Sequence, residues 1–254
     1  MCKRILALLC LICSSASWAI QENKTVRFAI GDWEPYTSRQ DNPEFKVAET
    51  IVRAAFANQG YQVELDYFPW SRAYKYAESG AYDGSFPWMM TPERQTIFLY
   101  SKPFFTQHIV FFYHKSSQFD WHSVEDLKKY RIGVTQDYAA TALLQKLGIT
   151  PDIDNEDGGS IIKLGKQRVD TYPAGLERGQ YLIKTLLEPS AAAQIMVHPK
   201  ALSEDYMHIL FTRADLQRSE HLSQVFSKGL KALFDSGEYY QIVDPANQLP
   251  TDDE

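Results

Sequence analysis

The part of this sequence expected to fold contains no cysteine. All three cysteines of the 254-residue chain lie near its N-terminus, at Cys2, Cys10 and Cys13. There, Lys3 and Arg4 precede nine apolar residues, and small residues follow as far as Ala19, a pattern typical of a secretory signal cleaved after Ala19. Removal of 19 of the 254 residues leaves 235 without a thiol. Disulfides, a thiolate nucleophile and cysteine-bound zinc are therefore excluded from the mature chain.

A membrane-spanning segment is also lacking. The apolar run of nine residues is too short to cross a bilayer, which needs roughly 20 residues. A lipid anchor on Cys13 is the less favoured alternative, because Ile12 stands where a small residue is needed. We therefore expect the mature protein to be soluble and to lie in the periplasm, outside the cytoplasmic membrane.

Positive charge is scarce. Lys3 and Arg4 leave with the signal, so 24 basic residues face 32 acidic ones and the mature net charge is −8. This argues against nucleic acid, whose binding needs clustered Lys and Arg, and no basic amphipathic stripe suits an anionic membrane.

Sequence motifs for catalysis and metal binding are missing too. We find no nucleophile elbow, phosphate loop or dinucleotide fingerprint, and the six histidines show no paired metal-ligand spacing. The acidic stretch "DIDNEDGG" (152–159) resembles a calcium loop, but Asp157 occupies the position that requires glycine. We expect a solvated loop there, and neither a metal nor a cofactor in the protein.

What is present is an alternation of strand and helix patterns. The first series has strands near 25–30, 61–68 and 81–86, a helix starting at Asn42 and Pro43, and a short helix capped by Ser71. The second begins after residue 115, with a capping box at Ser123 and Asp126. Two such series predict an α/β fold with two lobes and mostly parallel sheets.

The second series continues with a strand at 131–135 and a helix that Asp137 is placed to cap. A strand at 207–212 and a long helix from about Glu220 follow. The inward face of that helix is predicted to carry Leu222, Val225, Phe226, Leu230, Leu233 and Phe234.

Unusual side chains gather where these strands end. Ligands of parallel sheets bind beyond the carboxyl ends of the strands, so these side chains are candidates for a binding site. In the first series they are Trp33, Glu34, Tyr36, Trp70, Arg72, Trp88 and Arg94. In the second they are Tyr138, Thr141, Tyr172 and Glu177. Each has a structural alternative: core packing for the aromatics, a local ion pair with Asp83 or Glu93 for Arg94, and solvation for Glu177.

Several stretches resemble the extracytoplasmic solute-binding proteins of family 3, the polar amino-acid type that feed ABC importers. They are "GDWEPY", "FKVAETIVRAAFANQGYQVEL", "PWSRAYKYAESGAYDG", "TPERQTIFLYSKPFF", "DLKKYRIGVTQ" and "LSQVFSKGLKALFDSGEYYQIV". The resemblance covers essentially all of the mature chain.

The resemblance implies the two-lobed type II binding-protein fold, joined by two hinge strands. Lobe 1 would comprise residues 20–109 and 206–254, and lobe 2 residues 110–205. It also implies that Arg94, in "TPERQ", binds a ligand carboxylate, a role that suits the paired planar donors of a guanidinium.

Three departures from the family pattern leave the partner of a ligand amino group open. "PWMM" replaces a hydroxyl-rich stretch before Arg94, Gly175 stands near an expected acid, and "QDYAAT" replaces a small polar turn.

The sequence thus favours a monomeric periplasmic receptor that captures a small polar solute for an ABC importer. Two alternatives stay open. One is a sensory module acting on a membrane partner. The other is an enzyme on the same scaffold, with Glu34 or Glu177 as a general acid in an apolar setting.

Overall fold

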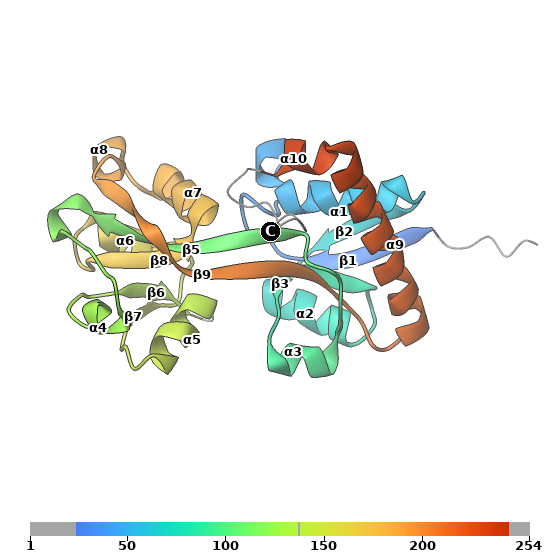
Figure 1. Cartoon of the computed structure of the whole chain (residues 1–254), viewed down its shortest axis with the longest axis horizontal. Helices are drawn as coiled ribbons and strands as arrows, with labels where there is room; N and C mark the ends of the chain where they lie inside the picture. The colour runs from blue at the N-terminus through green and yellow to red at the C-terminus, as the bar shows by residue number, and fades with distance from the viewer. Residues whose placement is uncertain (1–23, 137, 244–254) are drawn as a thin grey trace, which may run out of the picture.

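The computed structural model describes residues 24–136 and 138–243. The predicted signal sequence, its predicted cleavage site after Ala19 and the predicted cap Asp137 lie outside the described residues. Figure 1 shows two groups of helices and strands connected by the long strands β5 (Phe105–His114) and β9 (Ile195–Phe211). We call residues 110–205 lobe 2 and the other described residues lobe 1, following the division predicted from the sequence.

Lobe 1 is built on parallel strands. β1 (Thr25–Ile30) pairs in parallel with β2 (Gln62–Tyr67) and β3 (Gly84–Met89). Its helical elements are η1 (Pro43–Phe45), α1 (Val47–Asn58), α2 (Trp70–Glu78), α3 (Pro92–Ile97), α9 (Leu216–Ser236) and α10 (Glu238–Ile242). The short strand β4 (Leu99–Tyr100) pairs with β9.

The core of lobe 1 is aromatic. Phe28 of β1 meets Phe56 of α1 and Phe86 of β3, with ring centroids 5.9 and 5.2 Å apart. Helix α9 closes this core with the predicted inward residues: Leu222, Val225, Phe226, Leu230 and Leu233 are buried, and Phe234 packs beside them. The burial of these side chains fixes the carboxyl ends of β1 and β3 at the edge facing lobe 2.

Lobe 2 has a smaller, divided core. β6 (Gly133–Thr135) and β7 (Asp152–Asp154) form a parallel pair, and β8 (Thr171–Gly175) pairs antiparallel with β5. Its helical elements are η2 (Lys115–Ser117), α4 (Val124–Leu127), α5 (Ala139–Lys146), α6 (Gly159–Gly165), α7 (Leu176–Leu186) and α8 (Pro189–Ala192). The capping box of Ser123 and Asp126 is confirmed at α4.

The connecting strands make the large sheet mixed. Its order is β2-β1-β3-β9-β5-β8, and β9 runs antiparallel to β3 and to β5. Parallel strand pairing occurs between β1 and its neighbours β2 and β3 and between β6 and β7, whereas β9 with β3, β4 and β5, and β5 with β8, pair antiparallel. Both predicted lobe boundaries fall inside the connecting strands β5 and β9.

Several predicted element boundaries were wrong. Asn42 caps the short turn η1, and α1 begins later, at Val47. Helix α2 begins at Trp70, so Ser71 is not its cap. Helix α9 begins at Leu216, where Asp215 accepts a hydrogen bond from the Arg218 N–H, a turn before the predicted start. No helix among residues 24–136 and 138–243 is long and apolar enough to cross a membrane.

Candidate binding cleft

The loop after β1 reaches lobe 2. Trp33 donates from Nε1 to the hydroxyl of Tyr138 at 3.3 Å. Tyr36 donates its hydroxyl hydrogen to Glu177 Oε2 at 3.0 Å. Three of the predicted aromatic side chains and one predicted acid are therefore together, in two contacts between the lobes.

Burial fixes the direction of the Tyr36 contact. The side chain is almost fully buried, and this burial, together with the nearby Glu177 carboxylate, raises the pKa of Tyr36 well above its usual value. The hydroxyl therefore stays protonated and donates to the carboxylate. Gln107 of β5 is a second partner of this hydroxyl, to which it donates from Nε2 at 3.2 Å.

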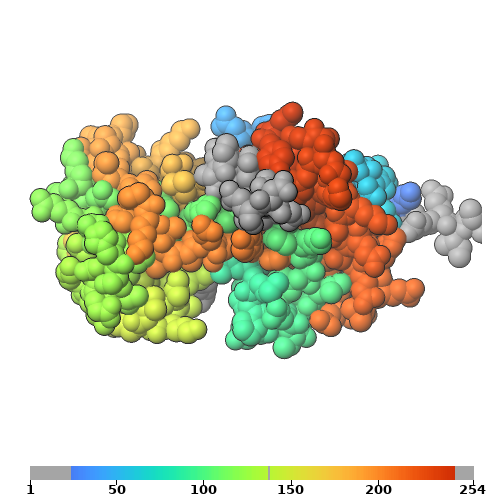
Figure 2. Space-filling model, viewed as in Figure 1, coloured from blue at the N-terminus to red at the C-terminus, as the bar shows by residue number. Residues whose placement is uncertain are grey.

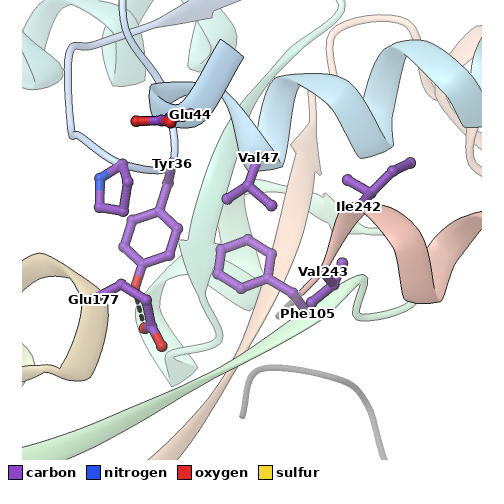
Figure 3. A pocket seen from close by; sticks show the side chains of 8 residues that line it. Tyr36, Glu44, Val47, Phe105, Glu177, Ile242 and Val243 are labelled. Atoms are coloured by element: carbon purple, nitrogen blue, oxygen red, sulfur yellow. Dashed lines mark hydrogen bonds between the residues drawn. The ribbon is translucent and has the colours of Figure 1, made fainter. Parts of the chain in front are cut away.

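A cavity of about 190 Å³ lies beside this contact. Figure 3 shows the Tyr36 hydroxyl pointing at Glu177, with the apolar side chains of Val47, Phe105, Ile242 and Val243 on the other side. The cavity thus touches both lobes, because Glu177 belongs to α7 and the other labelled residues to lobe 1.

Glu34 contacts lobe 2 through a residue that was not predicted. Arg178 of α7 donates from Nη1 to the backbone carbonyl of Glu34 at 2.7 Å, and the same nitrogen lies 3.6 Å from the Glu34 carboxylate. Its other terminal nitrogen is paired with Asp157. Arg178 is 6% exposed, and its Nε has no hydrogen-bond partner among the described residues.

Asp157 was the second residue that the sequence did not reveal. It belongs to the acidic stretch expected to be a solvated loop, but its side chain is 35% exposed and pairs with Arg178. Burial and the Asp157 carboxylate raise the pKa of the Tyr138 hydroxyl, which places Tyr138 in the same network. The sequence of an acidic stretch does not indicate which of its residues pairs with Arg178, 21 positions further along the chain.

Arg94 lies in lobe 1 without an acidic partner. Its guanidinium carbon is 4.7 Å from the centre of the Trp88 ring, and Nη1 donates to the Met89 carbonyl at 3.1 Å. No ion pair to Arg94 occurs within the described ranges, and Asp83 pairs with Arg218 instead. A half-buried guanidinium stacked on an indole keeps donors for an anion.

The two indoles beside Arg94 are held by lobe 1 itself. Trp88 donates from Nε1 to Ser85 Oγ at 2.8 Å, and Trp70 donates to the Asp32 carbonyl at 3.2 Å. Their rings meet edge to face with centroids 5.2 Å apart. Trp70 packs so closely on Gly31 that a Cβ there would lie 2.6 Å from the ring. The indoles therefore form a fixed wall and use their N–H groups internally.

Three predicted residues are not brought to this wall. Arg72 is exposed on α2. Thr141 is buried and donates to the Thr135 carbonyl at 2.6 Å. Tyr172 is fully buried in the core of lobe 2, where burial raises its pKa to about 12 and its hydroxyl lies 3.1 Å from Thr135 Oγ1.

The space between the lobes opens on one side. Figure 2 shows a notch in the outline between α5 of lobe 2 and the α3 region of lobe 1. Arg94 belongs to α3, and Tyr138 directly precedes α5. No group of three or more metal-ligating side chains within the described ranges is placed to hold a metal ion.

Solved structures share this fold. A histidine kinase sensor domain with similarity to periplasmic binding proteins has a TM-score of 0.68 at 18% identity, over 85% of this chain and 93% of that one. The arginine-, lysine-, histidine-binding protein ArtJ from Geobacillus stearothermophilus gives 0.67 at 20%, over 86% and 93%. EhuB in complex with hydroxyectoine gives 0.68 at 22%, over 88% of each chain.

No curated protein sequence matches the chain. The profile described as bacterial extracellular solute-binding proteins, family 3, matches residues 27–245, which include both lobes and both connecting strands. The chain belongs to this family of solute-binding proteins.

Proposed function

We propose that this protein captures a small polar solute bearing a carboxylate, between its lobes in the periplasm, and delivers it to an ABC importer. The observation that carries the proposal is Arg94. In an acidic protein it has no carboxylate partner among the described residues, and its guanidinium lies against Trp88. Arg94 belongs to α3, and the α3 region borders the notch between the lobes (Figure 2). A ligand carboxylate would provide the missing partner.

The contacts between the lobes support capture by closure. The loop of Trp33, Glu34 and Tyr36 meets Tyr138, Glu177 and Arg178 through three separate polar contacts. Contacts that exist only when the lobes are together lower the free energy of the closed form. Amino acids are the first class to test, since ArtJ, which shares the fold, is an arginine-, lysine-, histidine-binding protein.

The same contacts bear on the enzyme alternative. A general acid needs a surrounding that favours its protonated form. The carboxylate of Glu34 accepts from Ser38 Oγ at 3.0 Å and lies beside Arg178, and that of Glu177 accepts from Tyr36. Each carboxylate therefore has a hydrogen-bond donor beside it, unlike the apolar setting that a general acid needs.

A thermal-shift screen of amino acids, small carboxylates, opines and polyamines tests the proposal. At a hundredfold excess over Kd, a ligand stabilises the folded state by about 2.7 kcal/mol. Arg94→Ala should abolish the shift given by a carboxylate, because truncating one partner of such a pair costs about 2–5 kcal/mol. The matched control is Arg168→Ala, which removes an exposed arginine of lobe 2. Undiminished carboxylate binding by Arg94→Ala would refute the assignment, and turnover of the ligand would favour an enzyme.

A further inference from the structure

The cavity beside Tyr36 has a carboxylate without a counter-charge in its wall. Glu177 accepts a hydrogen bond at Oε2 from the Tyr36 hydroxyl, which is a neutral donor. No Lys, Arg or His of residues 24–136 and 138–243 forms an ion pair with Glu177, and the adjacent Arg178 pairs elsewhere, with Asp157 and Glu34. The other carboxylate oxygen of Glu177 is thus left without a partner in the described part of the chain.

The wall of this cavity is acidic at one end and apolar at the other. Among the described residues, its lining contains a second acid, Glu44 of η1, and no Lys, Arg or His. In Figure 3 both acidic side chains lie on the Tyr36 side of the view, whereas Ile242 and Val243 lie on the opposite side. Small-molecule sites combine an apolar lining with a few polar groups that fix the orientation of the ligand. This wall therefore suits a molecule with a cationic head and an apolar body.

The volume of the cavity limits the size of such a molecule. The cavity measures about 190 Å³. An apolar cavity of about 150 Å³ in a protein is large enough to bind benzene. An ammonium group on a body of about four to seven carbon atoms therefore matches this cavity in size as well as in polarity.

The cavity and the stacked guanidinium of Arg94 lie on opposite faces of the large sheet. Phe105, in the wall of the cavity, stands opposite Met207 of β9. Trp88, on which Arg94 stacks, stands opposite His208, the next residue of β9. Successive residues of a strand point to opposite faces of its sheet. A molecule in the cavity is therefore separate from a carboxylate that Arg94 binds.

The cavity also lies across the junction of the two lobes. Glu177 belongs to α7 of lobe 2, and the other lining residues belong to lobe 1. One turn further along α7, Tyr181 meets Phe45 of η1 edge to face, with ring centroids 5.3 Å apart. A molecule that contacts Glu177 and the lobe 1 wall together makes both contacts only while the lobes are in this arrangement. Its binding therefore favours the closed form over the open one.

We propose that this cavity binds a small primary amine, whose ammonium group pairs with Glu177 and whose hydrocarbon body packs against Val47 and Phe105. The amine is a second ligand, distinct from the transported solute, and it holds the lobes together. The site itself does not depend on the proposed function, whereas its effect on the affinity for a solute rests on it.

The first test compares benzylamine with benzyl alcohol, a neutral molecule of the same shape, by calorimetry. The wild-type protein should bind benzylamine about 10- to 100-fold more tightly than the alcohol. Glu177→Gln keeps an oxygen that accepts from Tyr36 and should erase this preference. The matched control is Glu188→Gln, which neutralises an exposed glutamate of lobe 2 and should retain it. Equal binding of both compounds by wild type, or an undiminished preference in Glu177→Gln, overturns the proposal.

The second test fills the apolar end of the cavity and leaves both acids in place. Val47→Phe should weaken benzylamine binding about 5-fold or more, because the added ring occupies the space of the ligand. The matched control is Val197→Phe, at an exposed position of β9 in lobe 2, which should bind benzylamine as wild type does. Unchanged affinity in a folded Val47→Phe protein would place the amine outside this cavity and overturn the proposal.

The third test separates the amine from the solute. Arg94→Ala should bind benzylamine as wild type does, and loss of benzylamine binding in this variant would place the amine in the solute site and overturn the proposal. Saturating benzylamine should raise the affinity for a stabilising carboxylate about 5-fold or more, and an unchanged affinity would overturn the role in holding the lobes together. If no carboxylate stabilises the wild-type protein, the proposed function fails, and the benzylamine measurements on Glu177→Gln and Val47→Phe still decide whether the amine site exists.

Discussion

Arg178 Nη1 and the backbone carbonyl of Glu34 are 2.7 Å apart, although the two residues are 144 positions apart in the chain. The bond ties the start of α7 in lobe 2 to the loop after β1 in lobe 1. Because the acceptor belongs to the backbone, it cannot be removed by changing the Glu34 side chain. This makes the contribution of Arg178 to lobe closure separable from that of the carboxylate.

Arg178→Ala should favour separation of the lobes. A hydrogen bond to a charged group contributes about 1.5–3 kcal/mol, so the ratio of closed to open molecules should fall by a factor of about 10 to 100. Small-angle scattering would report a larger radius of gyration. Glu34→Gln is the matched control, since it keeps the backbone acceptor and loses only the 3.6 Å ion pair. Identical scattering from Arg178→Ala and wild type would contradict this role.

Gly229 should tolerate no side chain. A Cβ at this position of α9 would lie 1.8 Å from the Ala55 carbonyl oxygen of α1, so the two helices would have to separate. We expect Gly229→Ala to lower the free energy of unfolding by about 3 kcal/mol, the upper end of the usual range for overpacking. Urea denaturation measures this. Lys228→Ala, an exposed neighbour, should change it by less than about 0.5 kcal/mol, and equal effects of the two would refute the close approach.

Asp83 should matter for stability and not for ligand binding. Its Oδ1 accepts from Arg218 Nε at 2.6 Å, and its Oδ2 accepts from Arg218 Nη2 at 3.1 Å and from the Arg27 N–H at 2.8 Å. Asp83→Ala removes all three bonds and should destabilise the fold by about 2–3 kcal/mol. Ligand affinity measured below the new Tm should stay unchanged. A loss of affinity without a loss of stability would contradict the structural role of Asp83.

His208 should make the protein less stable as the pH falls. Burial lowers its pKa, so below about 6.5, the ordinary value for histidine, the unfolded chain binds a proton that the folded chain excludes. Its contribution is complete above that pH and is lost as the pH falls through the lowered value.

The variant His208→Asn tests this, because it retains a donor for the Ser101 carbonyl and does not titrate. Between pH 5 and 6.5, its free energy of unfolding should depend less on pH than that of wild type. The difference is at most about 1.4 kcal/mol per pH unit, the value for one proton. Denaturation curves at several pH values measure it, and parallel dependences would show that His208 is not the group involved.

How far the sequence predicted the fold depends on the range of the interactions. Local signals worked: the capping box of Ser123 and Asp126 and the inward face of α9 are confirmed. Strand β9 was predicted only over its apolar end. Its first part carries Pro199, Lys200 and Glu204 and becomes a strand by pairing with β5, which no local pattern reveals.

The candidate site shows the same limit. Trp33, Tyr36 and Tyr138 could be predicted because they follow strands, and the structure brings them to contacts between the lobes. The roles of Arg178 and Asp157 could not be predicted, because nothing in the neighbouring sequence distinguishes an arginine inside a helix or one acid inside an acidic stretch. These roles depend on contacts with residues far away in the sequence, which sequence spacing does not determine.

The pairing of β5 with β9 has a consequence for the plan of the chain. Strand β5 leaves lobe 1 and β9 returns to it beside β5, with His108 opposite Glu204, so nearly all of lobe 2 (residues 110–205) lies beyond this pair. Lobe 2 is thus, in effect, a large insertion at the tip of a hairpin. A tight turn that links the two strands just beyond that pair would leave every lobe 1 strand with its lobe 1 neighbours. Lobe 1 could then be produced alone, and its affinity for a carboxylate could be measured in the absence of lobe 2.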